Sequence, residues 1–381
     1  MATILMVVKT TGLAYDDRIR KECLTFIELG HFPTILVLSD DNDSRRGITD
    51  YGIPFIEVCL KTRNYLPDAK GLLVKTFEMY LKMIPHIKQI RPDVIWIHNI
   101  EMAGLVPIAM SYKKKRWVKK IIWDQHELIP NRLMKFPFKT VIKNLVKKCD
   151  AVIQANVERK DFFINIFRIN PEKVEVLENF VDKIFLTLPP GSLPAKVSLW
   201  LDQKPYFLAQ GGGDPGRYLS ELVEAIIRLK KAKLIVVGPY EQVVVDVLKK
   251  QFNNEFDEWI LLTGKVPQLE LVNYIDNTIA SVIFYQSSNR NSFLCAPNRL
   301  YQALARGVPV IVGCNPPMKH LVERLKNGVV LEDDGKDSTQ VYKGLMELFN
   351  NYLLYAEQAK NNKHIFKWEK QSYVINELLH I

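Results

Sequence analysis

Cysteine is scarce in this sequence, and none of it has the spacing of a metal or redox site. The chain has five cysteines in 381 residues and no CxxC pair. They are Cys23, Cys59, Cys149, Cys295 and Cys314. Because zinc ribbons and dithiol redox sites need closely spaced pairs, the pattern predicts free, buried thiols in a reducing compartment.

Long hydrophobic runs are also missing. No stretch reaches the ~18 uncharged apolar residues that a membrane-spanning helix needs. The first residues, MATILMVV, lack a basic region and a small-residue cleavage site, and a helical pattern follows soon after them. We therefore expect a first strand rather than a signal peptide, and a cytoplasmic protein.

Positive charge, in contrast, is in excess and concentrated. The net charge is +10, with six basic residues around Trp117 in 113–120 and five lysines among apolar residues in 135–148. A basic amphipathic helix can lie on an anionic membrane surface or on nucleic acid, or can be an ordinary solvated face over a core stripe. No zinc-finger, RNP or homeodomain-like pattern is present, so we expect no nucleic-acid partner. The concentrated positive charge instead favours an anionic membrane surface as the partner, with the protein bound peripherally at the inner face of the cell membrane.

Short apolar segments alternate with helical patterns along the chain. The predicted strands are 3–8, 34–38, 94–97, 120–123, 151–154 and 174–177, then 206–210, 233–237, 259–262, 280–284 and 309–312. Two such series predict an α/β protein of two Rossmann-like, doubly wound domains facing a cleft, which is the default ligand site. The Pro- and Gly-containing stretch 182–203 reads as the linker. We expect an N-terminal domain over 1–185, a C-terminal domain over 200–360 and a terminal helix over 361–381.

A glycine loop follows the first strand of the second series. Gly211, Gly212 and Gly213 begin a GxGxxG pattern between a strand and a helix. The next strand, LIVVGPY, ends without the acidic residue that would bind a ribose in a dinucleotide site. A phosphate-binding loop, an NAD site and a tight turn are the three interpretations. Arg217 is expected to open the following helix, where an anion would neutralise it; a surface arginine is the alternative.

A second predicted helix start, which would also suit an anion, lies within NSFLCAPNRLYQALARGVPVIVG (291–313). We predict that this helix opens at Pro297, with Asn298, Gln302 and Arg306 four residues apart on one face. Unpaired N–H groups and the positive end of the helix dipole make a negatively charged ligand a natural guest there.

Two further polar stretches are candidates for chemistry. His126 and Glu127, in DQHE, follow a predicted buried strand, so they could orient a substrate hydroxyl or stabilise a developing positive centre. A structural His–carboxylate pair is the alternative. Asp41 and Asp43 form a DxD pattern, which can bind a metal, but a polar turn favours a solvated loop. We predict no metal, because no other His, Cys or carboxylate cluster is evident.

Four segments, taken in order, resemble the GT-B glycosyltransferases of the retaining family 4 type. They are AYDDRIRKECLTFIELGH, WDQHELIP, VEVLENFVD and APNRLYQALARGVPVIVG. The resemblance covers nearly the whole chain. Each segment alone is moderate evidence, and their shared order makes the match specific.

The resemblance implies an activity. A hexose would pass from a UDP- or GDP-sugar, held mainly by the C-terminal domain, to a glycan or lipid-linked acceptor in cell-surface polysaccharide assembly. Anomeric configuration would be retained, with no metal or other cofactor, and the terminal helix would cross back to the N-terminal domain. The implied catalytic residues are His126, Glu127 and Arg217. The implied nucleotide-sugar contacts are Gly211, Gly212, Gly213, Lys265, Asn298, Arg299 and Gln302.

Two positions depart from the family pattern. Gln302 stands where the family has a ribose-binding glutamate, and Leu294 stands at its companion acid eight residues earlier. An amide can bind a hydroxyl without charge assistance. The alternative function is therefore a catalytically weakened GT-B protein that binds a sugar nucleotide or glycan as a partner subunit.

Overall fold

The structure of the chain is a computed structural model, which describes residues 1–10, 12–13, 16–39, 44–66, 71–211, 213 and 215–380. It divides into two compact units. Unit 1 comprises Met1–Glu178 with Gln371–Ile381, and unit 2 comprises Asn179–Lys370. Each unit has a parallel sheet covered by helices, so the predicted α/β class is confirmed.

Unit 1 is built on an eight-stranded sheet. Its order is β3 (Arg46–Ile48), β4 (Pro54–Val58), β2 (Phe32–Leu38), β1 (Thr3–Lys9), β5 (Val94–His98), β6 (Lys120–Gln125), β7 (Ala151–Gln154) and β8 (Val174–Val176). All neighbours are parallel except β3 and β4. The central strands are continuous apolar runs, as expected where helices cover both faces. The short strands β3 and β4 lack such a run and were not predicted.

Six longer helices surround this sheet. They are α1 (Asp17–Glu28), α2 (Leu72–Ile90), α3 (Val106–Lys114), α4 (Phe138–Lys148), α5 (Val157–Phe167) and α17 (Ser372–Leu379). Helix α1 begins and ends at local signals: the Asp16 side chain accepts from the Ile19 N–H, and the chain turns away at Gly30 with φ +79°. An acidic N-cap and a left-handed glycine are the expected boundaries of a helix.

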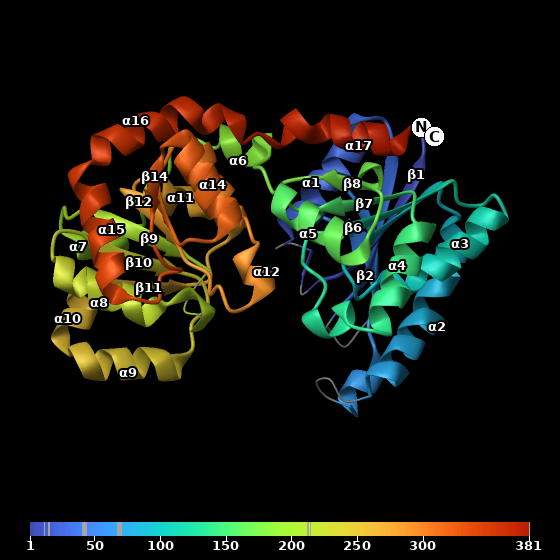
Figure 1. The fold of residues 1–381 in the computed structure, drawn as a ribbon, viewed down its shortest axis with the longest axis horizontal. Coiled ribbons are helices and arrows are strands. Elements are labelled where there is room, and N and C mark those ends of the chain that lie inside the picture. Colours follow the sequence, from blue (N-terminus) through green and yellow to red (C-terminus); the bar gives the residue numbers. More distant parts are fainter. Residues whose placement is uncertain are drawn as a thin grey trace. The chain divides into compact units, whose positions relative to one another are not determined.

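The last helix belongs to unit 1 although the preceding residues belong to unit 2. Figure 1 shows α17 beside α1, which it contacts. Gln371 accepts from the Glu178 N–H at 3.0 Å and donates to the Glu178 carbonyl at 2.6 Å. Lys120 Nζ donates to the Leu378 carbonyl at 2.9 Å. The expected return of the terminal helix to the N-terminal half is therefore observed.

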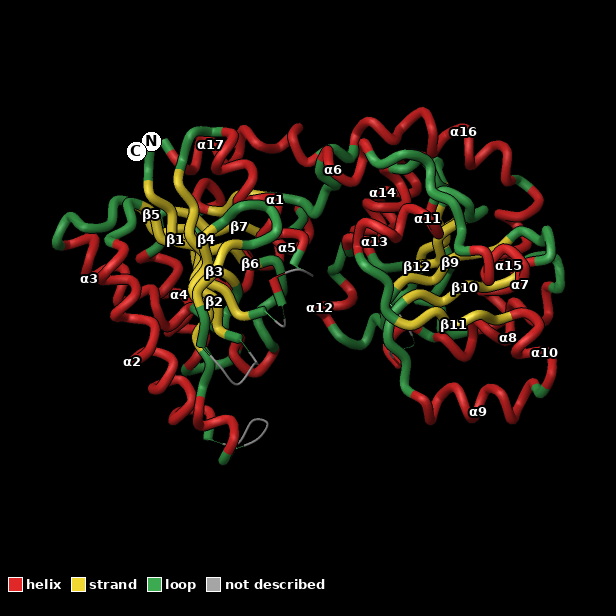
Figure 2. Tube along the Cα trace, turned by 180° about the vertical axis from the view of Figure 1, so that it is seen from behind, coloured by secondary structure: helices red, strands yellow, loops and turns green. Residues whose placement is uncertain are grey.

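Unit 2 is built on a six-stranded parallel sheet, whose twist is visible in Figure 2. Its order is β11 (Ile260–Gly264), β10 (Lys233–Val237), β9 (Tyr206–Gln210), β12 (Ala280–Ile283), β13 (Val310–Val312) and β14 (Gly328–Val330). Helices α8 (Leu219–Leu229), α9 (Gln242–Phe252), α10 (Asn254–Trp259) and α15 (Ser338–Asn350) contribute to one apolar core. Helices α13 (Asn298–Ala305) and α14 (Pro316–Leu325) contribute to the other. The short strand β14 was not predicted.

The stretch expected as a linker is instead part of unit 2. It carries α6 (Lys183–Thr187) and α7 (Ala195–Leu201), whose Phe185 and Val197 enter the apolar core. Arg306 donates to carbonyls of this stretch, and Asp276 accepts from the Gly191 N–H at 2.9 Å. Proline and glycine therefore shape a docked segment here. Among the described residues, no helix is long and apolar enough to cross a membrane.

Candidate functional site

The carboxyl edge of unit 1 gathers the polar residues that end two neighbouring strands. Strands β5 and β6 are paired so that His98 lies opposite Asp124. His126 and Glu127 follow one strand, and Asn99 follows the other. Ligands of open α/β sheets bind at such an edge.

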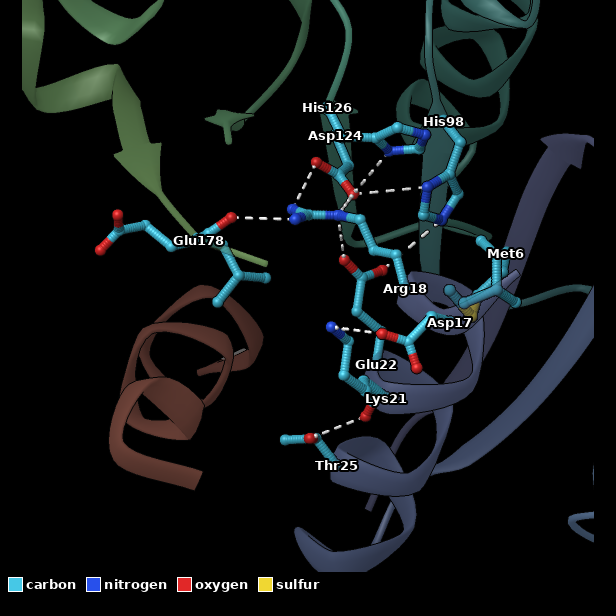
Figure 3. Close-up of polar contacts among 12 residues, drawn as sticks. Met6, Asp17, Arg18, Lys21, Glu22, Thr25, His98, Asp124, His126 and Glu178 are labelled. Atoms are coloured by element: carbon cyan, nitrogen blue, oxygen red, sulfur yellow. Dashed lines mark hydrogen bonds and ion pairs between the residues drawn. The ribbon is translucent and has the colours of Figure 1, made fainter. Parts of the chain in front are cut away.

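Arg18, in the first turn of α1, meets the carboxylate of Asp124. Its Nε and Nη2 donate to the two Asp124 oxygens at 2.7 and 2.8 Å, and its Nη1 donates to the Leu177 carbonyl at 2.9 Å. Figure 3 shows the guanidinium between Asp124 and Glu22. Both Arg18 and Asp124 are buried, so the two charges depend on each other. Burial alone would raise the pKa of Asp124, but Arg18 and the two histidines hold it well below its usual value.

Glu22 and His98 complete this buried charge cluster. Glu22 Oε1 lies 3.0 Å from Arg18 Nε, and Glu22 Oε2 lies 3.6 Å from His98 Nε2. Burial and the nearby Asp124 charge raise the pKa of Glu22 well above its usual value. Burial lowers the pKa of His98. The cluster thus favours a protonated Glu22 and a neutral His98 around one ionised pair, Arg18 and Asp124.

His126 lies at the solvent side of the cluster, with one fifth of its side chain exposed. Its Nδ1 is 3.6 Å from Asp124 Oδ2, and its Nε2 is 2.8 Å from Asn99 Nδ2. Arg159, on α5, donates to the His126 carbonyl and so fixes the backbone as well. The neighbouring Glu127 side chain is exposed. His126, which is held on three sides, is better placed for directed chemistry than Glu127.

Three donor atoms converge here in a way that the sequence pattern did not predict. His98, Asp124 and His126 each offer one ligand atom, and these atoms lie within 4.8 Å of one another. They meet only because β5 and β6 are adjacent. Arg18 already donates to both Asp124 oxygens, so its positive charge occupies the position of a cation at this carboxylate. The DxD pattern of Asp41 and Asp43 lies outside the described residues.

The carboxyl edge of unit 2 carries the glycine loop. Gly211 follows β9 with φ +94°, and its N–H donates to the Val237 carbonyl at 2.6 Å. A Cβ at Gly211 would lie 1.9 Å from Arg217 Nη1 and 2.8 Å from Arg299 Nη1. Glycine is therefore required for two reasons: the left-handed backbone and the closeness of two guanidinium groups. Gly213 is buried beside Leu219 and Tyr240, and Gly212 lies outside the described residues.

Arg217 and Arg299 converge beneath this loop. Arg217 donates to the Gly211 carbonyl, and Arg299 donates to the Gln210 carbonyl. The Arg299 guanidinium carbon lies 4.4 Å from the centroid of the Tyr285 ring, and that of Arg217 lies 5.6 Å from it. Burial lowers the pKa of Arg299, and the charge of Arg217 adds to this effect. Contrary to the prediction, Arg217 does not open the helix: it ends a short 3₁₀ turn, and α8 begins at Leu219.

The other predicted donor residues lie at the same edge of unit 2. Asn298 is the first residue of α13 after the N-cap Pro297, so the predicted helix start is displaced by one residue. Gln302 is buried in α13, and Leu294 is buried just before it. Lys265 is exposed directly after β11. The predicted contacts of Lys265, Asn298 and Gln302 with a nucleotide sugar stay predictions.

Sequence reasoning did not single out several residues of these two edges. Arg18 and Glu22 lie in the first segment that carries the family resemblance but had no predicted role, and Tyr285 lies in no motif. The signal for Arg18 was weak but present, because an arginine and a glutamate four residues apart share a helix face with apolar neighbours. No local pattern could pair Arg18 with Asp124, since 106 residues separate them.

Two parallel α/β units with polar carboxyl edges define the class of two-domain, Rossmann-like ligand-binding proteins. Comparison with known families narrows this class. Residues 20–183 match the family described as Glycosyltransferase Family 4, and residues 195–365 match Glycosyl transferases group 1. The chain belongs to these GT-B glycosyltransferases and is a transferase enzyme.

Individual relatives and solved structures agree with this assignment. An uncharacterized glycosyltransferase of Methanocaldococcus jannaschii is 24% identical over 286 residues, 71% of this chain and 69% of the relative. The O-antigen chain mannosyltransferase RfbU of Salmonella typhimurium is 23% identical over 381 residues, 89% of this chain and 99% of the relative.

Among structures, sucrose-phosphate synthase from Thermosynechococcus elongatus has a TM-score of 0.75 at 12% identity, over 99% of this chain and 98% of that one. Anabaena HepE in complex with UDP and glucose has a TM-score of 0.71 at 15% identity, over 100% and 99%. At these identities the structures establish the fold alone.

Proposed function

We propose that the enzyme transfers a hexose from a UDP- or GDP-sugar to a glycan or lipid-linked acceptor during cell-surface polysaccharide assembly. Unit 2 binds the donor and unit 1 the acceptor. The reaction retains anomeric configuration and uses neither a metal nor another cofactor. The observation that carries the proposal is Arg299, a buried cation beside the glycine loop that lacks a carboxylate partner among the described residues.

The charges at Arg299 favour a diphosphate. Its side chain is 8% exposed, and its Nε and Nη2 are buried with no hydrogen-bond partner. Another cation, Arg217, lies over the same tyrosine ring, and its charge also lowers the pKa of Arg299. A buried cation costs several kcal/mol unless an anion compensates it. A diphosphate beside the glycine loop would compensate the charge of Arg299, and the same contact would stabilise the leaving group of a sugar nucleotide.

The comparisons support the donor and acceptor classes. Anabaena HepE is seen with UDP and glucose, and RfbU is an O-antigen chain mannosyltransferase. Lys265, Asn298 and Gln302 then supply contacts to the nucleotide. His126 and Glu127 supply the polar edge that faces the acceptor side of the reaction.

Calorimetric titration with UDP, GDP and their sugars tests the donor half. We expect one nucleotide to bind. Arg299→Ala should weaken the affinity for this nucleotide at least 100-fold, and a thermal unfolding transition should show that the variant is still folded. Arg228→Ala is the matched control, because Arg228 also stacks on a tyrosine, Tyr342, at 4.2 Å but lies in α8 away from the glycine loop. If no nucleotide binds, or if both variants bind equally well, the donor site is wrong.

A second candidate function follows from Gln302 and Leu294. Both are buried in the donor-binding region, and neither can offer the carboxylate of the family pattern. A catalytically weakened partner subunit would bind a sugar nucleotide without transferring or hydrolysing it. Gln302→Glu should create turnover in such a protein. Robust turnover by the unaltered chain would exclude this candidate.

We further propose that the cytoplasmic enzyme docks on the inner face of the cell membrane through α4 and the residues before it. Phe136, Phe138 and Val141 are 86%, 51% and 53% exposed among the lysines of this segment. Exposed aromatic residues with interleaved lysines suit an anionic bilayer surface. Flotation with liposomes containing anionic lipid should carry the protein upward, and Phe136→Ser with Phe138→Ser should abolish this. Phe32→Ser is the control, because Phe32 on β2 is also an exposed phenylalanine, at 61%. Equal flotation without anionic lipid would contradict the proposal.

A further inference from the structure

Asn99, in the turn after β5, forms hydrogen bonds through its backbone and through its side chain. It follows β5 with a left-handed backbone, φ 54°. Its N–H donates to the Asp124 carbonyl at 2.8 Å, and its carbonyl accepts from Trp123 Nε1 at 3.0 Å. Its side chain reaches Glu127 and His126. Asn99 thus joins the end of β5 to the whole segment that carries His126.

These contacts fix which side-chain atom of Asn99 faces the histidine. The Glu127 N–H points at one end of the amide, at 3.4 Å, and a backbone N–H can only donate. That end must be the oxygen, so the NH₂ group faces His126 Nε2 at 2.8 Å. An NH₂ group can only donate, and His126 Nε2 must therefore accept.

The same reasoning fixes the imidazole. A neutral ring that accepts at Nε2 carries its proton on Nδ1. His126 Nδ1 faces Asp124 Oδ2 at 3.6 Å, and a carboxylate can only accept. The Asn99 hydrogen bond therefore selects this tautomer, and the negative charge of Asp124, 3.6 Å from Nδ1, favours it electrostatically from the other side of the ring. Figure 3 shows Asp124 below the His126 ring, where Arg18 in turn holds the carboxylate.

We propose that Asn99 is a positioning residue that keeps His126 in the Nδ1–H tautomer and so presents Nε2 as a hydrogen-bond acceptor. In this structure the Asn99 NH₂ group lies where a ligand that donates a hydrogen bond to His126 Nε2 would bind. On the proposed function, that ligand is a sugar or acceptor hydroxyl, which donates to Nε2 when it displaces the amide. His126 then receives a hydroxyl hydrogen bond and does not donate one.

If residue 99 had only a structural role, glycine or aspartate could replace the asparagine. Glycine would satisfy the left-handed backbone, and aspartate would keep the oxygen that accepts from Glu127. Neither supplies the NH₂ donor to His126. Asn99→Asp and Asn99→Gly thus separate the backbone role from the tautomer role, because both suit the turn and both remove that donor.

Nitrogen-15 NMR of the histidine side chains at neutral pH tests the assignment without any substrate. We expect His126 of the unaltered enzyme to show a protonated Nδ1 and an unprotonated Nε2. Asn99→Asp should place a proton on Nε2, facing the new carboxylate, and Asn99→Gly should give a mixture of tautomers. Asn170→Ala is the control, because Asn170 is an exposed helix cap in the same unit whose side chain hydrogen-bonds to Glu172, far along the chain from His126. A protonated Nε2 in the unaltered enzyme, or an unchanged spectrum in both Asn99 variants, would overturn the proposal.

Transfer kinetics then test the role of this acceptor. With a folded Asn99→Asp enzyme, we expect kcat to fall by about 10²-fold, the scale on which loss of one active-site hydrogen bond lowers kcat, while donor KM changes little. Because the NMR result does not depend on turnover, it stands even if the transferase proposal fails. A switched tautomer with unchanged kcat would contradict the catalytic use of Nε2.

Discussion

At the scale of single residues, Arg18 compensates the buried negative charge of Asp124 in unit 1. It is the described cation that donates to both oxygens of Asp124, and both side chains are almost fully shielded from water. A buried ion pair contributes little net stability, but removing one partner leaves an uncompensated charge. The pair is therefore best probed by breaking it.

Arg18→Met should lower the free energy of unfolding by about 3–5 kcal/mol, because Asp124 would remain buried without its cation. Chemical denaturation followed by fluorescence measures the change. The control is Arg45→Met, since Arg45 pairs with Glu57 but is 65% exposed. An exposed pair is worth about 1 kcal/mol or less. Similar losses in the two variants would show that Asp124 is not a buried charge.

Glu22 gives a pH dependence of definite sign. Its pKa is raised on folding, so its contribution to stability is complete below the pKa of an unfolded glutamate and is lost as pH rises through the folded value. Glu22→Gln removes this titration. The variant should match the unaltered protein in acid and exceed it in stability as pH rises toward neutral and above. Melting temperatures across this pH range test the prediction, and parallel curves would contradict it.

At the scale of elements, α17 is the part of unit 1 that the chain supplies last. Its buried residues Val374, Ile375, Leu378 and Leu379 complete an apolar surface, and Gln371 fastens its start to Glu178. Burying one such side chain is worth about 1.5–3 kcal/mol. Loss of the helix should therefore destabilise unit 1 severely.

Truncation after Lys370 should lower the unfolding temperature of unit 1 and leave unit 2 nearly unchanged. Hydrogen exchange followed by mass spectrometry reports on each unit separately. Protection should fall in β1 and α1 and persist in β9 and β10. Uniform loss of protection in both units would mean that α17 supports more than the unit to which it is packed.

At this scale, short sequence patterns predict the buried strands and the helix ends for physical reasons. The continuous apolar runs of β1, β5, β9 and β10 were predictable because a buried parallel strand needs apolar residues on both faces. The start and end of α1 were predictable because Asp16 and Gly30 are local signals. β14 and the docked segment with α6 were not, because short elements take their stability from neighbours distant in sequence.

At the scale of the whole molecule, the two units have separate cores and separate polar edges. The proposed donor site is built within unit 2, and the His126 cluster within unit 1. A ligand stabilises the part of a protein to which it binds. The two proposals can therefore be tested independently in the intact chain.

A donor nucleotide at 100 times its dissociation constant should stabilise unit 2 by about 2.7 kcal/mol. Hydrogen exchange should slow in β9, α8 and α13, and Arg299→Ala should remove the effect. Protection that appears first around β5 and β6 instead would place the nucleotide in unit 1 and contradict the assignment of the donor.

The sequence by itself determined the α/β class, the two series of strands, the glycine loop and the segments that carry family membership. Each of these depends on residues close together in the chain, such as Gly211 to Arg217 or Asp124 to Glu127. The tertiary structure alone decided that Arg18 holds Asp124, that Asn99 faces His126, and that Arg299 lies buried beside Arg217. The reason is physical: the protonation and charge of these groups depend on burial and on partners up to 106 residues away, which no local pattern contains.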